Sequence, residues 1–255
     1  MREHDIYRLV QRKGSCTINE LARTLNVSGE TIRRNVKKLT AEGLVVKRHG
    51  GISLPIQSQE PPIMNRMQRR ISEKKRIAEM VADQIEDGDS VIIDTGSTTA
   101  YCAQALQGHS NLTIVTNTSY ISNLLASKNG NRVFMAGGEL RAHDAAAFGS
   151  SVIDFFKSFH ADKSIISIGA VDARHGCMNY ELCEAEVARV VIQQSELVIV
   201  ATDASKFGKC SVAKVCDLNA IDVMVTDSPP SQALMHEIER SGVTLKLAPE
   251  LENAA

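Results

Sequence analysis

Residues 17–39 read TINELARTLNVSGETIRRNVKKL, and this stretch decides the fold of the N-terminal part of the chain. Thr17, with Glu20 three positions later, is a capping-box pattern, which predicts that a helix begins here. The helical pattern breaks at Asn26, and Ser28 can cap another helix that follows after roughly three residues. Two helices this close in the chain are typical of a helix-turn-helix motif.

Apolar residues at helical spacing extend this motif on both sides. The expected buried positions of three successive helices are Ile6, Leu9 and Val10, then Ile18, Leu21, Ala22 and Leu25, then Ile32, Val36 and Leu39. Two short β-prone runs then flank Gly50 and Gly51, which predicts a hairpin. Together these elements predict a winged helix-turn-helix domain over residues 1–55.

Cations and hydroxyl groups occupy the outward positions of the third helix and the hairpin. Such side chains suit base edges near the start of the helix and phosphates farther along. The candidate DNA-binding residues are Ser28, Thr31, Arg33, Arg34, Asn35, Lys37, Lys38, Lys47, Arg48 and His49. For one basic helix alone, a solvated face beside an ordinary turn would be the favoured interpretation. Three helices in register with a basic hairpin favour binding to duplex DNA instead.

Charge is divided unevenly along the chain. The net charge of the 255 residues is −1, yet residues 1–59 contain 11 Lys and Arg against 5 Asp and Glu, a balance of +6. The remaining residues contain 18 against 25, a balance of −7. A basic segment joined to an acidic body is typical of a polyanion-binding module attached to another domain.

Composition excludes several classes of protein. A hydrophobic content of 43% with 23% charged residues indicates a globular rather than a disordered chain. No apolar run approaches the ~18 residues of a membrane span, and the N-terminus lacks the apolar core of a signal peptide. The six cysteines form no C-x-x-C pair, so we expect buried thiols. We therefore expect a cytoplasmic protein without a membrane segment.

Residues 56–72 are predicted to connect the first domain to a second one at 73–255. Pro55, Pro61 and Pro62 disfavour a continuous helix in this connection. A basic cluster overlaps its end, and the favoured interpretation is a solvated helix face, with DNA contact as the alternative. The cluster contains Arg66, Arg69, Arg70, Lys74, Lys75 and Arg76.

Strand and helix patterns alternate over the rest of the chain. The β-prone runs are Val91–Ile93, Leu112–Val115, Arg132–Ala136, Ser164–Ile168, Leu197–Ala201, Val223–Thr226 and Val243–Leu247. This alternation predicts an α/β domain with a mostly parallel sheet covered by helices. Small polar residues follow several strands, as in Asp94–Thr99, and a lysine, Lys206, follows another. Since the carboxyl ends of parallel strands share one edge, these residues predict a pocket for a small phosphorylated polyol.

The first domain resembles a known family. The resemblance is carried by Glu20-Leu21-Ala22, Leu25-Asn26-Val27-Ser28, Thr31-Ile32-Arg33-Arg34, Leu39, Gly43 and Arg48-His49-Gly50-Gly51. In order and spacing these blocks resemble the N-terminal signature of the DeoR family of bacterial transcriptional regulators. Asn35 is a departure, because the family usually has Asp there. An acidic group can orient the paired arginines by a charged hydrogen bond, whereas Asn35 offers a weaker, neutral one.

The second domain looks like the sensor domain of the same family, which is similar to ribose-5-phosphate isomerase. Its motifs here are Asp94–Thr99, Thr116-Asn117, Ala136–Arg141, Gly149, Glu184–Val187, Asp203 and Ser205–Gly208. The resemblance implies phosphate contact by Gly96, Ser97, Thr98, Thr99 and Lys206, and hydroxyl contact by Asp94, Asn117, Glu139 and Arg141. Thr116, Gly138 and Glu184 complete the candidate effector-binding set. Thr118 and Ala204 depart from the family pattern.

The resemblance implies a DNA-binding repressor of a carbohydrate or polyol operon, without a cofactor. Its expected partners are operator DNA, a phosphorylated sugar or polyol effector, and further copies of the chain. One alternative is a sugar-phosphate isomerase with a DNA-binding appendage, whose candidate bases are Asp172, Glu181, Glu184 and Glu186. We favour capping or ligand contact for these carboxylates, since none has the paired arrangement of an isomerase. His160 and His175 show no metal-ligand spacing. Another alternative is an architectural DNA-binding protein with a vestigial pocket.

Overall fold

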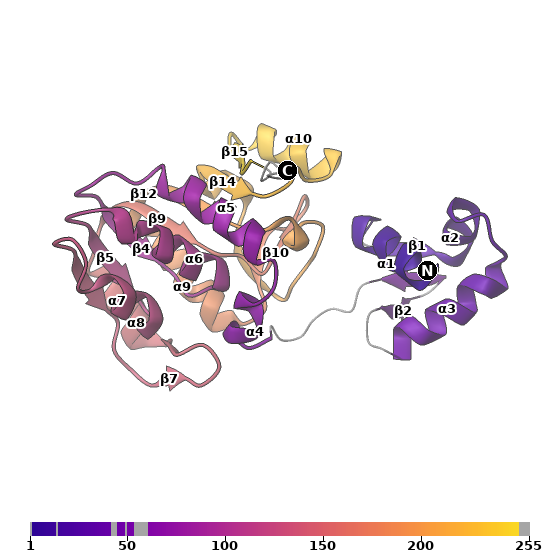
Figure 1. Cartoon of the computed structure of the whole chain (residues 1–255), viewed down its shortest axis with the longest axis horizontal. Helices are drawn as coiled ribbons and strands as arrows, with labels where there is room; N and C mark the ends of the chain where they lie inside the picture. Colours follow the sequence, from indigo (N-terminus) through magenta and orange to yellow (C-terminus); the bar gives the residue numbers. More distant parts are fainter. Residues whose placement is uncertain (1, 14, 42–44, 49, 54–60, 250–255) are drawn as a thin grey trace, which may run out of the picture. The chain divides into compact units, whose positions relative to one another are not determined.

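The computed structural model describes the chain except for residues 1, 14, 42–44, 49, 54–60 and 250–255. The chain divides into two compact units, Met1–Gln57 and Ser58–Ala255 (Figure 1). Among the described residues, no helix has the length and apolar character that crossing a lipid bilayer requires.

The first unit contains the predicted three helices and hairpin. Its elements are α1 (Arg2–Lys13), β1 (Ser15–Thr17), α2 (Ile18–Thr24), α3 (Gly29–Ala41), β2 (Val46–Arg48) and β3 (Gly51–Ser53). The strand β1 was not predicted; it pairs with β3, so that the hairpin becomes an antiparallel sheet of order β1-β3-β2. Gly51 allows this close pairing, because a Cβ atom there would lie 2.4 Å from the carbonyl oxygen of Cys16.

Local hydrogen bonds fix the helix-turn-helix as the sequence predicts. The Thr17 hydroxyl accepts from the backbone N–H of Glu20 at 3.1 Å, and the Glu20 carboxylate accepts from the backbone N–H of Thr17 at 2.8 Å. The Ser28 hydroxyl accepts from the backbone N–H of Thr31 at 3.2 Å and so caps α3. Asn26 makes the turn in the left-handed region, at φ +50°.

The core of the first unit confirms most of the predicted apolar positions. Buried side chains are Ile6, Leu9, Val10, Leu21, Ile32, Val36 and Leu39, with Val45 and Ile52 from the hairpin. Ile18, Ala22 and Leu25 were predicted to be inside and are only partly buried against this core. The short helix α2 therefore contributes mainly Leu21, because its other apolar residues lie at the edge of the unit.

The second unit is built on a seven-stranded sheet that is parallel throughout, in the order β15-β14-β12-β9-β4-β5-β6. Its strands are β4 (Ser90–Ile93), β5 (Thr113–Thr116), β6 (Arg132–Met135), β9 (Ala161–Ile166), β12 (Ser195–Ala201), β14 (Val223–Thr226) and β15 (Thr244–Leu247). Each overlaps a predicted run, with the largest shift at β9, where Ser164–Ile168 was predicted. The predicted α/β fold is confirmed.

Helices cover both faces of this sheet (Figure 1). One face packs against α5 (Ile71–Ala82), α6 (Ser97–Ala105) and α7 (Ser119–Leu125). The other packs against α8 (Ser150–Lys157), α9 (Leu182–Gln193) and α10 (Gln232–Arg240). Within β4, Ile92 faces one core cluster while Val91 and Ile93 face the other. Continuous apolar runs in these strands follow from burial on both sides.

Shorter elements connect the main strands and helices of the second unit. They are α4 (Ile63–Met67), η1 (Leu106–Gly108), β7 (Leu140–Arg141), β8 (Ala146–Ala147), β10 (Ala170–Asp172), β11 (Gly176–Asn179), η2 (Ala204–Lys206), β13 (Ala213–Cys216) and η3 (Leu218–Ala220). The strands β10, β11 and β13 form a separate antiparallel sheet, and β7 pairs with β8.

The order of the sheet contains one topological switch point. From β4 the chain proceeds outward through β5 to β6, and then returns to β9 on the other side of β4. The connection that leaves β4 leads to α6. The connection that leaves β9 leads through β10 and β11 to α9, and α6 and α9 cover opposite faces of the sheet. Connections that diverge in this way leave a crevice at the carboxyl ends of the two strands, where α/β proteins bind ligands.

Residues 63–72, predicted as linker, are folded onto the second unit. They form α4 and the start of α5, and α4 packs against α6. The basic cluster predicted here as a solvated face is largely engaged within the unit. The Lys74 side chain is buried, with its ammonium group donating to the carbonyl oxygen of Arg69 at 2.9 Å. Arg76 donates to the carbonyl oxygen of Pro249 at 2.6 Å.

Candidate functional site

The predicted DNA-binding residues occupy one helix and the hairpin of the first unit. Those with exposed side chains are Ser28, Arg33, Arg34, Lys37, Lys38 and Lys47, whereas Thr31 and Asn35 are half-buried. Arg48 belongs to β2 through its backbone. His49 lies outside the described residues. A groove between α3 and the hairpin has Arg33 on one side and Lys47 on the other.

The cations of α3 make only weak contacts within the unit. Arg33 lies 3.3 Å from the Glu30 carboxylate, with side chains 64% and 82% exposed, and Lys38 lies 2.9 Å from the Glu3 carboxylate. Exposed ion pairs of this kind contribute about 0–1 kcal/mol. DNA phosphates can therefore replace these carboxylates at little cost.

Asn35 does not contact the paired arginines in this structure. Its side-chain amide donates to the carbonyl oxygen of Thr31, one turn earlier in α3, at 2.7 Å. The expected weak hydrogen bond from Asn35 to an arginine is thus replaced by a bond within the helix. Arg33 and Arg34 remain on the exposed face without an acidic neighbour at position 35 to orient them.

A small cavity lies at the switch point of the second unit. Its lining residues come from the connections after β4 and β9 and from α4, β11, α9 and η2. They are Arg66, Thr95, Ser97, Thr98, Ser167, Ile168, Gly169, Asn179, Glu184 and Lys206. The cavity volume of about 20 Å³ is room for roughly one water molecule. A larger ligand requires the long side chains of Arg66, Glu184 and Lys206 to move apart.

The N-terminus of α6 supplies groups that favour an anion in this cavity. The helix begins after Gly96 without a side-chain cap. The side chains of Ser97 and Thr98 are only 7% and 5% exposed, and within the described part of the chain their hydroxyl groups have no hydrogen-bond partner. Unpaired N–H groups and the helix dipole attract negative charge at such a position.

Gly96 holds the start of α6 against the connection after β9. A Cβ atom at this position would lie 1.9 Å from the Ser167 hydroxyl oxygen and 2.7 Å from the Ser167 Cβ. Its φ of −173° is ordinary extended backbone, so the lack of space and not the conformation demands glycine. Thr99 is fully buried, and its hydroxyl donates to the carbonyl oxygens of Asp94 and Gly96. Gly96 and Thr99 therefore shape the site without lining it.

Asp94 joins the ends of β4 and β9. Both of its carboxylate oxygens accept from the backbone N–H of Ser167, at 3.0 and 3.2 Å. Burial raises the pKa of Asp94 well above its ordinary value, and the hydrogen bonds from Ser167 oppose this shift only in part. Asp94 was predicted to contact an effector hydroxyl, yet it does not line the cavity.

Replacing Asp94 with Asn is expected to change how stability depends on pH. The amide oxygen can still accept from Ser167, so we expect the variant to fold. The raised pKa means that the folded protein retains a proton that the unfolded chain releases above about pH 4, so this group lowers stability as the pH rises. The free energy of unfolding of the variant, minus that of the natural chain, should therefore increase from about pH 4 to about pH 8 in urea titrations. A difference that stays constant would contradict the assignment.

Asn117 and Thr116 lie beneath the site. Asn117 is fully buried, where its side chain accepts from the Thr95 hydroxyl at 2.9 Å and donates to the carbonyl oxygen of Ala147 at 2.9 Å. Thr116 is also fully buried. Gly138 and Glu139 are exposed beyond the end of β6, the edge strand of the sheet. The predicted residues that do line the cavity are Ser97 and Thr98 at the start of α6, Glu184 in α9 and Lys206 in η2.

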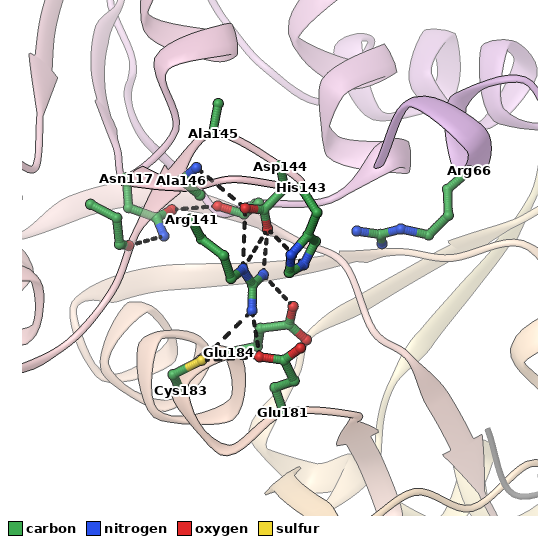
Figure 2. Close-up of polar contacts among 12 residues, drawn as sticks. Arg66, Asn117, Arg141, His143, Asp144, Ala145, Ala146, Glu181, Cys183 and Glu184 are labelled. Atoms are coloured by element: carbon green, nitrogen blue, oxygen red, sulfur yellow. Dashed lines mark hydrogen bonds and ion pairs between the residues drawn. The ribbon is translucent and has the colours of Figure 1, made fainter. Parts of the chain in front are cut away.

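Arg141 is the centre of an ion-pair cluster that Figure 2 shows. Its guanidinium contacts Asp144, and it pairs with Glu181 at 2.7 Å and with Glu184 at 2.6 Å. It also lies 4.2 Å from the centre of the Phe148 ring. Burial by itself lowers the pKa of Arg141, but hydrogen bonds to Asp144 and Glu184 outweigh it and leave the pKa raised. Arg141 thus ties the β7–β8 loop to α9, and of this cluster Glu184 lines the cavity.

Six lining residues were not among the predicted site residues: Arg66, Thr95, Ser167, Ile168, Gly169 and Asn179. Thr95 lies inside a motif that was recognised, next to residues that were chosen. Ser167 and Asn179 follow β9 and end β11, and the sequence gives no order of strands that would bring them to β4. Arg66 was placed in a solvated basic cluster, and only its position in the tertiary structure brings it to the cavity.

Three of the carboxylates considered for isomerase chemistry, Asp172, Glu181 and Glu184, have structural partners. Asp172 accepts from the backbone N–H groups of Arg174 and His175 and lies 2.7 Å from the His175 ring. With Cys210 these two side chains form a group whose ligand atoms lie within 4.8 Å of one another. His175 is therefore less isolated than its sequence position suggests. Hydrogen bonds within a turn account for the arrangement of Asp172 and His175.

Cys210 is exposed, contrary to the expectation of buried thiols.

Both units match known families and known proteins. Residues 2–58 match the DeoR-like helix-turn-helix domain, and residues 69–228 match the DeoR C terminal sensor domain. The chain is 35% identical over 246 residues to the glycerol-3-phosphate regulon repressor of Escherichia coli (strain K12), covering 96% of this chain and 98% of that protein. It is 33% identical over 230 residues to the HTH-type transcriptional repressor GlcR of Bacillus subtilis (strain 168), covering 90% and 88%. Ribose 5-phosphate isomerase from Plasmodium falciparum is similar over 55% of this chain and 53% of that chain, at 15% identity and a TM-score of 0.40.

Proposed function

The chain belongs to the DeoR family of transcription regulators, and from this premise we propose that it represses an operon for a carbohydrate or polyol under control of a phosphorylated effector. The observation that carries the proposal is the pair of hydroxyl side chains, Ser97 and Thr98, that line the cavity at the start of α6, where the helix has no side-chain cap. Lys206 and Arg66 line the same cavity.

The lining residues suit a phosphoryl group attached to a small polyol. The first N–H groups of α6 and the hydroxyl groups of Ser97 and Thr98 can donate to phosphoryl oxygens, and Lys206 adds a positive charge. Glu184 and Asn179 are the lining groups that can hold hydroxyl groups of the polyol. Because Glu184 is already paired with Arg141, the remaining charge at the cavity favours an anion.

Glycerol 3-phosphate is the first effector to test. A relative with 35% identity over nearly the whole chain is named for the glycerol-3-phosphate regulon. A small ligand also requires the least displacement of the side chains that fill the cavity.

We expect calorimetry to show binding of glycerol 3-phosphate, with weaker binding of inorganic phosphate and none of glycerol. Ser97→Ala should reduce the affinity for glycerol 3-phosphate about tenfold or more, because a hydrogen bond to a charged group contributes roughly 1.5–3 kcal/mol. The matched control is Ser150→Ala, which removes an exposed hydroxyl at the start of α8, another helix that follows a glycine. Equal affinities of the Ser97 variant and the natural chain would contradict the site.

DNA binding is the output of the proposed switch. We propose that α3 enters the major groove, with Arg33 and Arg34 near bases and Lys37, Lys38 and Lys47 on phosphates. Two copies of the chain would hold two such modules on two half-sites of an operator, in the cytoplasm, where a bacterial operator lies. Sedimentation of the free protein and of its operator complex tests this assembly, and a single copy on a full operator would contradict it.

A further inference from the structure

The short helix α4 is fastened across the carboxyl edge of the sheet. At its start, the backbone N–H of Ile63 donates to the carbonyl oxygen of His143 in the β7–β8 loop at 3.1 Å. At its end, the Tyr101 hydroxyl of α6 donates to the carbonyl oxygen of Met67 at 3.0 Å. These two bonds connect α4 to the β7–β8 loop and to α6, the helix whose first residues line the cavity.

Arg70 fixes the joint between α4 and α5. Its backbone is in the left-handed region, at φ +53°. Its guanidinium lies 3.2 Å from the Asp203 carboxylate and 2.8 Å from the Asp227 carboxylate, which follow β12 and β14. Asp203 also caps η2, the turn that ends with Lys206. The element that carries Arg66 and the element that carries Lys206 are therefore joined through Arg70.

Arg66 extends from α4 into the cavity. Figure 2 shows its side chain pointing from the helix toward the region of Arg141 and His143. Its Nε atom donates to the carbonyl oxygen of Pro61 at 2.9 Å, and its side chain lines the cavity together with Ser97 and Lys206. One guanidinium group thus reaches both the cavity and the residue that directly follows positions 54–60 of the connection to the DNA-binding unit.

A guanidinium group has the geometry for two simultaneous tasks. Its five N–H donors lie in a fixed plane, and two of them can hold a phosphoryl group while a third points elsewhere. In Arg66 the Nε–H is directed to Pro61, and the side chain lines the cavity, where its terminal nitrogens can donate to a phosphoryl group. A lysine has the charge but cannot make both contacts in this planar arrangement.

We propose that Arg66 binds the phosphoryl group of the effector and that, through its bond to Pro61 and the fastening of α4, it transmits occupation of the cavity to the connection with the DNA-binding unit. This inference rests on the proposed function of the cavity, and it adds the residue that couples effector binding to operator binding. In this proposal Ser97 and Lys206 bind the effector, whereas Arg66 both binds the effector and couples its binding to the connection with the DNA-binding unit.

The test separates binding from coupling by measuring two quantities for each variant. Calorimetry gives the affinity for glycerol 3-phosphate, and a fluorescence titration gives the operator affinity with and without saturating glycerol 3-phosphate. Arg66→Ala should weaken effector binding about tenfold to a hundredfold, as for loss of hydrogen bonds to a charged group. Saturating effector should change the free energy of operator binding by Arg66→Ala by less than about a third of the change that it causes in the natural chain.

Three further variants make the result specific. Arg66→Lys should retain part of the effector affinity and lose the operator response. Ser97→Ala should bind the effector weakly and, once saturated, show the full operator response. Arg69→Ala removes the same charge from a neighbouring exposed side chain and should change neither quantity.

The outcomes that overturn the inference differ from those that overturn the proposed function. Natural effector affinity in Arg66→Ala, or a full operator response at saturation, would overturn the role of Arg66 and leave the cavity as the effector site. Absence of binding by the natural chain to both glycerol 3-phosphate and inorganic phosphate would overturn both proposals.

Discussion

Replacing Arg33 and Arg34 together with alanine is expected to weaken operator binding by on the order of a hundredfold or more, since each arginine paired with a base contributes about 1–3 kcal/mol of discrimination. Both side chains are exposed on α3, where Arg33 pairs with the exposed carboxylate of Glu30. The stability of the first unit should therefore change little. The operator can be obtained by selection from random duplexes, and affinity measured by fluorescence anisotropy.

The control for this variant carries the same loss of charge at other exposed positions. Arg8 and Arg23 are exposed on α1 and α2. Replacing both with alanine should lower affinity for operator and random DNA by similar factors, because the lost term is general attraction to phosphates. In the Arg33 and Arg34 variant, the main effect should instead be a fall in the ratio of the affinity for operator DNA to the affinity for random DNA. An unchanged ratio would contradict the assignment of α3 as the recognition helix.

Replacing Gly96 with alanine is expected to abolish the response to the effector. The new Cβ would overlap the Ser167 side chain, at 1.9 Å from its hydroxyl oxygen, so the start of α6 must move away from the connection after β9. Overpacking of this kind typically costs about 1–3 kcal/mol of stability. The displaced α6 would no longer direct its N–H groups into the cavity. Thermal unfolding and calorimetry with glycerol 3-phosphate measure the two effects.

A second substitution should reverse the effect of Gly96→Ala. Adding Ser167→Gly removes both atoms that the new Cβ would meet most closely, while the backbone N–H of residue 167 still donates to Asp94. Stability and effector binding should return toward natural values. Gly108→Ala is the matched control, because a Cβ atom there meets nothing within 4 Å. Failure of the double variant to recover would show that the contact with Ser167 is not the reason for glycine.

The main sheet could be predicted because its strands are strongly patterned. Runs such as Val91–Ile93 are apolar on both faces and are separated by helical patterns, which is typical of a parallel sheet. The elements that were missed are short. The strand β1 has three residues, and α4 has five residues that directly follow two prolines. Such segments have too few residues for a periodic pattern, and they fold because tertiary contacts hold them.

The site could be predicted only where the chemistry is local. The sequence Gly96-Ser97-Thr98 predicts an anion-binding helix start by itself, and the structure places Ser97 and Thr98 in the cavity. Asn117 and Arg141 were chosen for the same pocket, yet each bonds to groups about 30 or more positions away in the chain. Pairings at this distance depend on the order of strands, which the sequence does not reveal. For the same reason Arg66 was assigned to a solvated face.

The most direct test of effector-controlled DNA binding is a reciprocal measurement on the natural chain. The operator affinity is measured with and without saturating glycerol 3-phosphate, and the affinity for glycerol 3-phosphate is measured with and without saturating operator. Thermodynamic linkage requires the two ratios to be equal, and coupling of this kind is typically about 5-fold to 150-fold. We predict equal ratios within that range. A ratio of one in both measurements, with glycerol 3-phosphate bound, would contradict the account.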